Sequence, residues 1–264
     1  MALTNHLDRA TGRVADEQDV IADERRAYER FRTTVETTAT DAHSTTSAAS
    51  TGAGAAAVGL QRRSRPDRGC SEIRAAFAET VRPYSTDDID REESVIETLG
   101  AELGDSIAAA LSPETTHEFT PQLKTAILAA VDDRHAELAV MERALTREAE
   151  SLQTAVEAYD DITDRLLERN ETSLFEFGFP GLRQRHEALA ADRETCERLL
   201  ERRQELLAST TSRGGDAGIN HRTLVRYLYQ SQPATYPALS TLVQLDSTLA
   251  DCQRTLRDHL TRRV

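Results

Sequence analysis

Apolar residues recur at intervals of seven over much of the chain, and this spacing predicts long helices. The clearest series lies within residues 121–170 and consists of Val131, Leu138, Leu145, Leu152, Tyr159 and Leu166. A heptad repeat of this kind lines one side of an α-helix. Thr120 is a favourable N-cap, and Pro121 is typical of the first helical residue. The pattern therefore predicts one helix over about 121–170, roughly 75 Å long.

A second seam with the same spacing runs through the first 38 residues. Its members are Leu7, Val14, Ile21, Tyr28 and Val35. The companion positions of the heptad are apolar only at the two ends, so the predicted amphipathic helix has a narrow apolar stripe. An isolated helix of this kind gains little stability from propensity alone and needs a partner. The sequence leaves open whether that partner lies within the chain or in a second copy.

Residues 39–69 differ in composition from everything around them. Ser, Thr, Ala and Gly dominate this stretch, and large apolar side chains are almost absent. Such a segment cannot bury enough apolar surface to offset the entropy lost on ordering. The composition predicts a flexible linker, which ends in a basic stretch containing Arg62, Arg63, Arg65 and Arg68.

The remaining residues, 70–264, are predicted to form a helical bundle. Gly178, Pro180 and Gly181 end the long helix segment and predict a corner, followed by a return helix over about 181–209. A C-terminal hairpin is predicted over about 221–262. Short connections favour antiparallel neighbours. The predicted fold is therefore all-α, an elongated antiparallel coiled-coil or helical bundle with one very long central helix.

Three of the six tyrosines are concentrated in "RYLYQSQPATY", residues 226–236. They are Tyr227, Tyr229 and Tyr236. One interpretation is a packing joint that docks the last helical hairpin onto the bundle, in which turn backbone supplies hydrogen-bond partners for buried hydroxyls. The alternative is a ligand pocket. The joint interpretation predicts that replacing Tyr227 by Ala lowers the melting temperature.

The charge of the chain is strongly acidic, with a formal net value of −13 at pH 7. Lys124 is the single lysine among 32 Lys and Arg residues. Acidic, lysine-poor surfaces resemble those of haloarchaeal proteins, where negative charge keeps proteins soluble in concentrated salt. The Debye length is only about 3 Å at about 1 M salt, so phosphate contacts by arginines are weakened there. Nucleic-acid binding through Arg62–Arg68 is therefore an alternative function rather than the preferred one.

Candidate chemistry in the sequence is sparse. Asp132 and His135 have the spacing of half a dimetal ligand set, but no second acid-x-x-His pair occurs on another helix. Cys70, Cys196 and Cys252 form no CxxC pair, and neither phosphate-loop nor hydrolase motifs occur. We therefore predict no catalytic residue, no metal site and no cofactor. An enzyme with an interhelical site that the sequence does not disclose remains a second alternative.

Four stretches in order resemble an uncharacterised haloarchaeal helical family, a domain of unknown function. They are "DERRAYERFRTTVE" at 23–36, "IRAAFAETV" at 73–81, "FTPQLKTAILAAV" at 119–131 and "LVRYLYQSQPATYPAL" at 224–239. The resemblance covers nearly the whole chain apart from the linkers. It implies an all-helical fold and haloarchaeal origin, and it transfers no activity or site.

The sequence favours a non-enzymatic interaction or scaffold protein. The length of the 121–170 helix motivates this prediction, because the helix exceeds what a compact core can bury. The predicted partners are proteins, either a second copy in a homodimer or another helical protein, and not membranes. The N-terminus lacks an apolar signal core, and the longest apolar run is too short to span a bilayer, so we expect a cytoplasmic protein.

Overall fold

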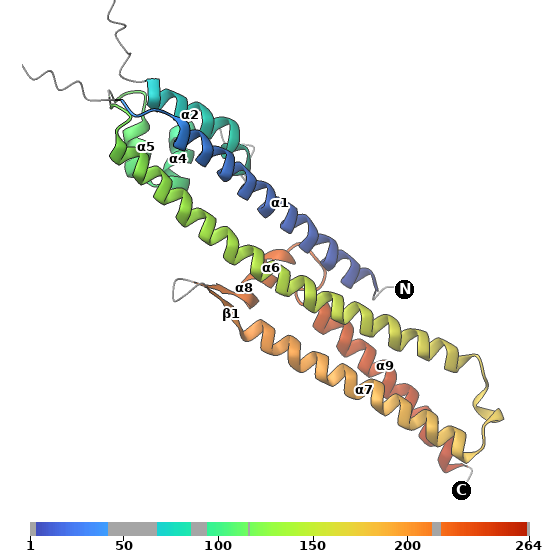
Figure 1. Ribbon diagram of the computed structural model, residues 1–264. Coiled ribbons are helices and arrows are strands. Elements are labelled where there is room, and N and C mark those ends of the chain that lie inside the picture. The colour runs from blue at the N-terminus through green and yellow to red at the C-terminus, as the bar shows by residue number, and fades with distance from the viewer. Residues whose placement is uncertain (1–3, 42–67, 86–93, 116, 213–217, 263–264) are drawn as a thin grey trace, which may run out of the picture. The chain divides into compact units, whose positions relative to one another are not determined.

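The computed structural model describes residues 4–41, 68–85, 94–115, 117–212 and 218–262 (Figure 1). Most of the predicted linker at 39–69, including Arg62, Arg63 and Arg65, lies outside the described residues. Helices account for nearly all the secondary structure of the described residues, which confirms the prediction of an all-α fold with one very long helix. None of the described helices has both the length and the apolarity that crossing a bilayer requires.

The helices are α1 (Thr4–Thr37), α2 (Arg68–Thr80), α3 (Arg82–Ser85), α4 (Val95–Leu103), α5 (Asp105–Leu111), α6 (Pro121–Asn170), α7 (Phe179–Ala208), α8 (His221–Leu228) and α9 (Pro237–Thr261). A 3-10 turn, η1 (Leu174–Glu176), lies between α6 and α7, and two short strands, β1 (Thr210–Thr211) and β2 (Ile219–Asn220), lie between α7 and α8. The chain divides into two compact units. Unit 1 comprises Met1–Asp19 and Ala139–Val264, and unit 2 comprises Val20–Leu138, so α1 and α6 each contribute to both.

The boundaries of α6 follow from its sequence. The Thr120 hydroxyl accepts a hydrogen bond from the backbone N–H of Leu123 at 3.1 Å, which satisfies one of the free donors at the helix start. Pro121 occupies the first helical position, where its missing N–H costs nothing. The helix then continues to Asn170, the end that the heptad series predicts.

Unit 2 is built around an aromatic core between α1, α2 and α6. Phe31 and Phe77 meet edge to face with ring centroids 5.6 Å apart, and Phe119 and Ile127 are fully buried with them. Gly104 separates α4 from α5 and has φ 95°, a backbone conformation that residues with a side chain rarely adopt. The break between the two helices therefore falls at a residue that can adopt this conformation without strain.

Polar contacts of unit 2 join α1 to α6 and α4. Arg134 on α6 lies 2.9 Å from Glu24 and 3.5 Å from Glu102, and the Tyr28 hydroxyl donates to Glu102 at 2.6 Å. Burial, reinforced by the adjacent Glu102 carboxylate, raises the pKa of Tyr28. The Lys124 ammonium donates to the backbone carbonyls of Glu36 at 2.6 Å and Thr38 at 3.0 Å. The single lysine of the chain thus caps the C-terminal end of α1.

Unit 1 contains a helical layer in which α7 and α9 lie side by side and antiparallel (Figure 1). Their apolar stripes include Leu182, Leu189 and Cys196 on α7, all of which are buried. Burial raises the pKa of the Cys196 thiol to about 11, which keeps it protonated and inert at neutral pH. The α6 segment of the same unit runs antiparallel to α7, because Arg165 pairs with Asp192 while Glu148 pairs with Arg203.

A small antiparallel ladder, which the sequence pattern does not predict, follows α7. Thr210 pairs with Asn220 and Thr211 with Ile219. The Asn220 side chain then accepts from the backbone N–H of Thr223 and so caps the start of α8. Two-residue strands are too short to leave an alternating apolar signature. Their effect is to bring the start of α8 back beside the end of α7.

Candidate functional site

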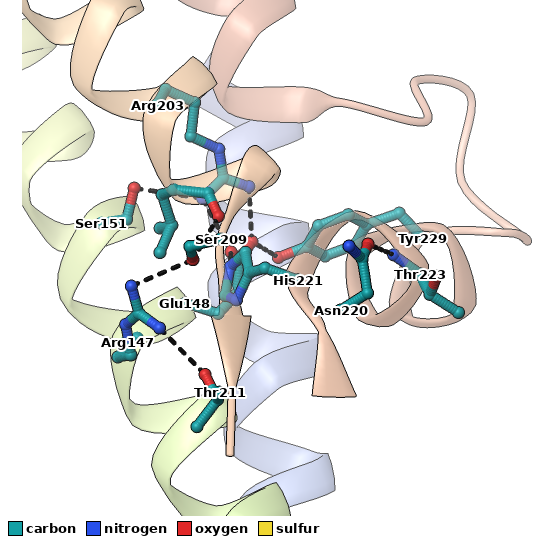
Figure 2. Close-up of polar contacts among 11 residues, drawn as sticks. Arg147, Glu148, Ser151, Arg203, Ser209, Thr211, Asn220, His221, Thr223 and Tyr229 are labelled. Carbon is teal, nitrogen blue, oxygen red and sulfur yellow. Dashed lines mark hydrogen bonds and ion pairs between the residues drawn. The ribbon is translucent and has the colours of Figure 1, made fainter. Parts of the chain in front are cut away.

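Four buried side chains from separate elements of unit 1 converge on one carboxylate (Figure 2). Glu148 lies on α6, Arg203 on α7, His221 is the first residue of α8, and Tyr229 directly follows α8. Each of the four is almost completely shielded from solvent. Buried charges of this kind persist only when they are paired and hydrogen-bonded.

The Glu148 cluster, defined by these four residues, saturates its carboxylate. Arg203 forms a two-pronged contact, in which Nη2 donates to Oε1 and Nη1 to Oε2, both at 2.7 Å. The Tyr229 hydroxyl donates to Oε1 at 2.6 Å, and His221 Nε2 lies 2.8 Å from Oε2. Because an ionised carboxylate can only accept, the His221 hydrogen belongs on Nε2 in this arrangement. Each carboxylate oxygen therefore accepts two hydrogen bonds.

The electrostatics of the cluster keep Glu148 ionised. Burial alone raises the pKa of Glu148, but hydrogen bonds from His221, Arg203 and Tyr229 outweigh it and lower the pKa to about 2. Burial and the adjacent carboxylate raise the pKa of Tyr229, so its hydroxyl stays protonated and remains a donor. The cluster thus holds a full negative charge at neutral pH, balanced by the Arg203 guanidinium.

A second arginine positions the segment that carries His221. Arg147 donates from Nη1 to the Thr211 hydroxyl at 2.9 Å and from Nη2 to the Ser209 hydroxyl at 3.0 Å (Figure 2). The backbone N–H of His221 donates to the carbonyl of Ser209 at 3.1 Å. These contacts hold the end of α7, the strand ladder and the start of α8 together. His221 is consequently fixed in the position from which it reaches Glu148.

The chemistry of the Glu148 cluster is structural rather than catalytic. A catalytic carboxylate must reach a reacting atom, whereas both oxygens of Glu148 are occupied and none of the four side chains is open to solvent. The cluster instead ties α6, α7 and α8 to one another through charge-assisted hydrogen bonds. In the described part of the chain, no three His, Cys, Asp or Glu side chains gather as a metal-binding group.

Beside the cluster lies a cavity of about 270 Å³ between α6, α7 and the start of α9. We call it the arginine cavity, because Arg147, Arg202 and Arg203 all line it. Arg203 both lines this cavity and pairs with the buried Glu148. Apolar side chains complete the wall, namely Ala155, Leu199, Leu206, Ala238 and Leu242.

A larger and mainly apolar groove lies near the corner between α6 and α7. Its volume is about 520 Å³, and its apolar lining consists of Leu166, Leu167, Leu174, Leu189 and Leu256. Two of the most exposed large apolar side chains of the described residues are found at this corner, since Phe175 is 77% exposed and Leu167 is 61% exposed. Leu167 also lines the groove, and Phe175 directly follows its lining residue Leu174 in the chain. We refer to it as the corner groove.

The three predicted joint tyrosines occupy different environments. Tyr229 is fully buried in the Glu148 cluster, whereas Tyr227 is 45% exposed and Tyr236 is half-buried at the start of α9. The Tyr227 hydroxyl donates to Glu17 at 3.2 Å, and the Arg13 guanidinium lies 5.9 Å from its ring centroid. None of the three lines the arginine cavity or the corner groove. The structure therefore makes Tyr229, rather than Tyr227, the residue whose loss should cost the most stability.

The predicted seams are buried within the single chain. All five residues of the first seam are shielded from solvent, and in α6 Val131, Leu138, Leu145, Leu152 and Tyr159 are buried while Leu166 is half-buried at the corner groove. Their burial shows that neither seam offers a free surface along most of its length. The protein-binding role predicted for the seams would therefore require other residues.

Asp132 and His135, the spaced acid and histidine of α6, do not converge. Asp132 is exposed and pairs with Arg32, while His135 packs against the edge of Tyr28 and lies 3.6 Å from Glu29. Burial lowers the pKa of His135, which favours its neutral form at neutral pH. Both side chains thus have structural contacts in unit 2.

One member of the Glu148 cluster could have been found from the sequence, by its spacing from two leucines of the heptad seam. Glu148 lies three residues after Leu145 and four before Leu152, and both leucines are seam positions. This spacing places a charged side chain on the buried face of the helix. A charge at such a position must find a partner, although the sequence does not say which arginine supplies it.

Comparison with known proteins gives a family and no activity. A family model described as "Domain of unknown function (DUF7260)" matches residues 5–253. The match includes all four stretches that resemble a domain of unknown function, so that expectation is confirmed. No curated protein and no solved structure matches the chain.

Proposed function

Because the chain belongs to this family of unknown function, we propose a function from its own surfaces: it is a non-enzymatic helical interaction protein. Its partner is a second copy of the same chain, bound through the corner groove. The observation that carries the proposal is the combination of an apolar groove with strongly exposed apolar residues at one corner of unit 1. Leaving such residues in water is unfavourable, and an interface relieves that cost.

The composition of the groove supports a protein partner. No Asp or Glu is among its lining residues, although the chain contains 45 acidic residues. The charged side chains on its rim are Arg169 and Arg185. Arg169 pairs with Asp192, and Arg185 lies 3.9 Å from the ring centroid of Phe177. The surface is therefore apolar at its centre, and both arginines on its rim are already held by contacts within the chain, so two copies of the patch can meet without bringing carboxylates of the groove together.

A second copy fits this corner because the corner has both a projecting side chain and a groove that could receive it. Phe175 protrudes next to the groove, and its ring is held edge to face against His259 of α9 with centroids 5.3 Å apart. A two-fold interface uses the same patch on both subunits, so each copy must present a projection and a recess. The exposed Phe175 of one copy would enter the groove of the other, and the reverse contact would follow by symmetry.

The composition of the chain supports a cytoplasmic setting in a halophile. Its surface is acidic and contains one lysine, and in concentrated salt the repulsion between two acidic copies would be screened over about 3 Å at about 1 M. Hydrophobic contacts do not suffer from this screening. An apolar interface is accordingly the kind of contact that would operate between such copies.

Size-exclusion chromatography with light scattering in concentrated KCl tests the proposal. We expect the wild-type protein to be dimeric and the Leu167→Glu variant to be monomeric, because a buried charge in the groove would lack a partner. Val243→Glu is the matched control, since Val243 is 56% exposed on α9 and does not line the groove. The control should remain dimeric.

A monomeric wild-type protein at every concentration examined would overturn the proposal, as would a Leu167→Glu variant that dimerises normally. Point variants are preferable to removing residues 1–69. That deletion would take away Leu7 and Val14, which are buried in unit 1, and would confuse loss of assembly with loss of folding.

A further inference from the structure

We propose that the arginine cavity binds a small organic anion, whose acidic group is held by Arg147 and Arg202 and whose apolar part contacts the leucine wall. This site is separate from the corner groove and does not depend on the proposed dimer. The ligand class is a carboxylate or phosphate monoester with a short chain or a single ring. The argument rests on the charge, the shape and the hydrogen-bonding capacity of the cavity.

The charge balance of the cavity is unusual for this chain. Arg203 is neutralised by Glu148, whereas among the described residues the hydrogen bonds of Arg147 go to the hydroxyls of Ser209 and Thr211. Neither Arg147 nor Arg202 has an ion-pair partner among the described carboxylates. Glu150 is the one acid in the lining, and it is exposed. Three arginines and one glutamate thus border one cavity in a protein with a net charge of −13, and the described residues show no ion pair for Arg147 or Arg202.

Arg147 is also held in place for binding. Its two hydrogen bonds fix the guanidinium against Ser209 and Thr211 and leave its remaining N–H groups unused. A guanidinium fork matches the geometry of carboxylate and phosphate oxygens. Because the side chain is already ordered, binding would cost little additional side-chain entropy. Arg202 is exposed on α7 and can close over the acidic group from the solvent side.

The remaining lining defines the rest of the ligand. Ser151 accepts a hydrogen bond from Arg203 at 3.0 Å, so its own hydroxyl hydrogen is available to an anion. The Thr154 hydroxyl already donates to the Glu150 carbonyl at 2.9 Å. Opposite these polar groups stand Leu199, Leu206 and Leu242. The cavity volume of about 270 Å³ admits one ring or a short chain, and not a nucleotide or a long lipid.

Isothermal titration calorimetry with phenyl phosphate, benzoate and phenol tests the inference. The two anions should bind saturably to the wild-type protein, whereas phenol, the neutral ring, should not. Inorganic phosphate should bind more weakly than phenyl phosphate, because only phenyl phosphate has a ring that can contact the leucine wall. The better of the two ring-bearing anions identifies the preferred acidic group.

Variants locate the binding site. Arg202→Gln should weaken binding of the preferred anion by about ten-fold or more, since one charge-assisted contact is lost. Arg198→Gln is the matched control, because Arg198 is exposed on the same helix and does not line the cavity. Its affinity should equal that of the wild type, and thermal unfolding should show both variants to be folded.

Three outcomes of the titrations with the wild-type and Arg202→Gln proteins would overturn the inference. They are the absence of saturable binding up to about 10 mM anion, equal affinities of the wild-type and Arg202→Gln proteins, and binding of phenol as tight as that of phenyl phosphate. A Leu167→Glu variant adds a further check. Anion affinity that survives this change places the binding outside the corner groove, whereas its loss would contradict the proposed site.

Discussion

Replacing Arg203 by Met should destabilise the protein by about 3–5 kcal/mol, the usual cost of leaving a buried charge without its partner. Arg203 and Glu148 are both shielded from solvent and meet through two hydrogen bonds of 2.7 Å. The pKa of Glu148 has the same direction, because His221, Arg203 and Tyr229 together lower it to about 2 and so stabilise the ionised carboxylate.

Denaturant unfolding at neutral pH in concentrated KCl measures this loss. The denaturant concentration at the midpoint of unfolding should fall, while the dependence of the free energy of unfolding on denaturant concentration stays constant. Arg193→Met is the matched control on the same helix. Arg193 also makes a cross-helix ion pair, with Asp246 at 2.9 Å, but both partners are partly exposed. Such a pair contributes about 0–1 kcal/mol, and salt weakens it further. A loss of less than about 1 kcal/mol in Arg203→Met, or equal losses in the two variants, would refute the reasoning.

The dependence of stability on acidic pH provides a second test, which reports on the Glu148 carboxylate itself. A carboxylate whose folded pKa is depressed contributes stability that is fully present above its unfolded pKa and is lost as the pH falls through the folded value. The wild-type protein should therefore lose stability relative to Glu148→Gln between pH 4.5 and about 2. The difference between the two should be constant at higher pH. A difference that stays constant through this window would show that Glu148 is not held ionised by its partners.

Four further variants, at Lys124, Gly104 and Gly12, test helix capping and backbone conformation. Lys124→Met should cost about 1–2 kcal/mol in denaturant unfolding, because α1 loses the ammonium that caps its final carbonyls, and Lys124→Arg should recover part of this loss. Gly104→Ala should destabilise by about 1–3 kcal/mol, since φ is 95° there, while Gly12→Ala within α1 should stabilise by about 0.5–1 kcal/mol. An added Cβ meets nothing within 4 Å at either glycine, so changes of the same sign would contradict the backbone explanation.

The sequence predicts a helix well where the residues that start or end it agree with its apolar periodicity. For α6, the Thr120–Pro121 start and the uninterrupted heptad series predict the observed Pro121–Asn170 helix. For the helix predicted over about 181–209, the only clear signals are the Gly and Pro residues before it. The observed α7 begins at Phe179 instead of about 181. The short strands escape prediction because two residues leave no alternation. The predicted linker at 39–69 stays a prediction, since most of it lies outside the described residues.

The candidate sites are much harder to predict, because their residues are distant in sequence. Arg203 follows Glu148 by 55 positions, and His221 follows it by 73. A helical pattern shows which face Glu148 occupies but not which arginine of many meets it. The prediction drawn from the tyrosine-rich segment 226–236 was placed on Tyr227, whereas the buried tyrosine is Tyr229, which directly follows α8.

The α6 segment in unit 1 carries both Glu148 of the buried cluster and Leu167 of the corner groove, to which the proposed function assigns dimerisation. Glu148 and Leu167 are separated by roughly 28 Å along the helix at 1.5 Å per residue, and they share no partner. Near Glu148 both carboxylate oxygens are occupied by hydrogen bonds from Arg203, His221 and Tyr229. Near Leu167 the apolar surface is open. Changes at sites so far apart are expected to add independently. Loss of dimerisation in Leu167→Glu without loss of stability, beside the opposite result in Arg203→Met, would therefore separate an interaction surface from the structure that supports it.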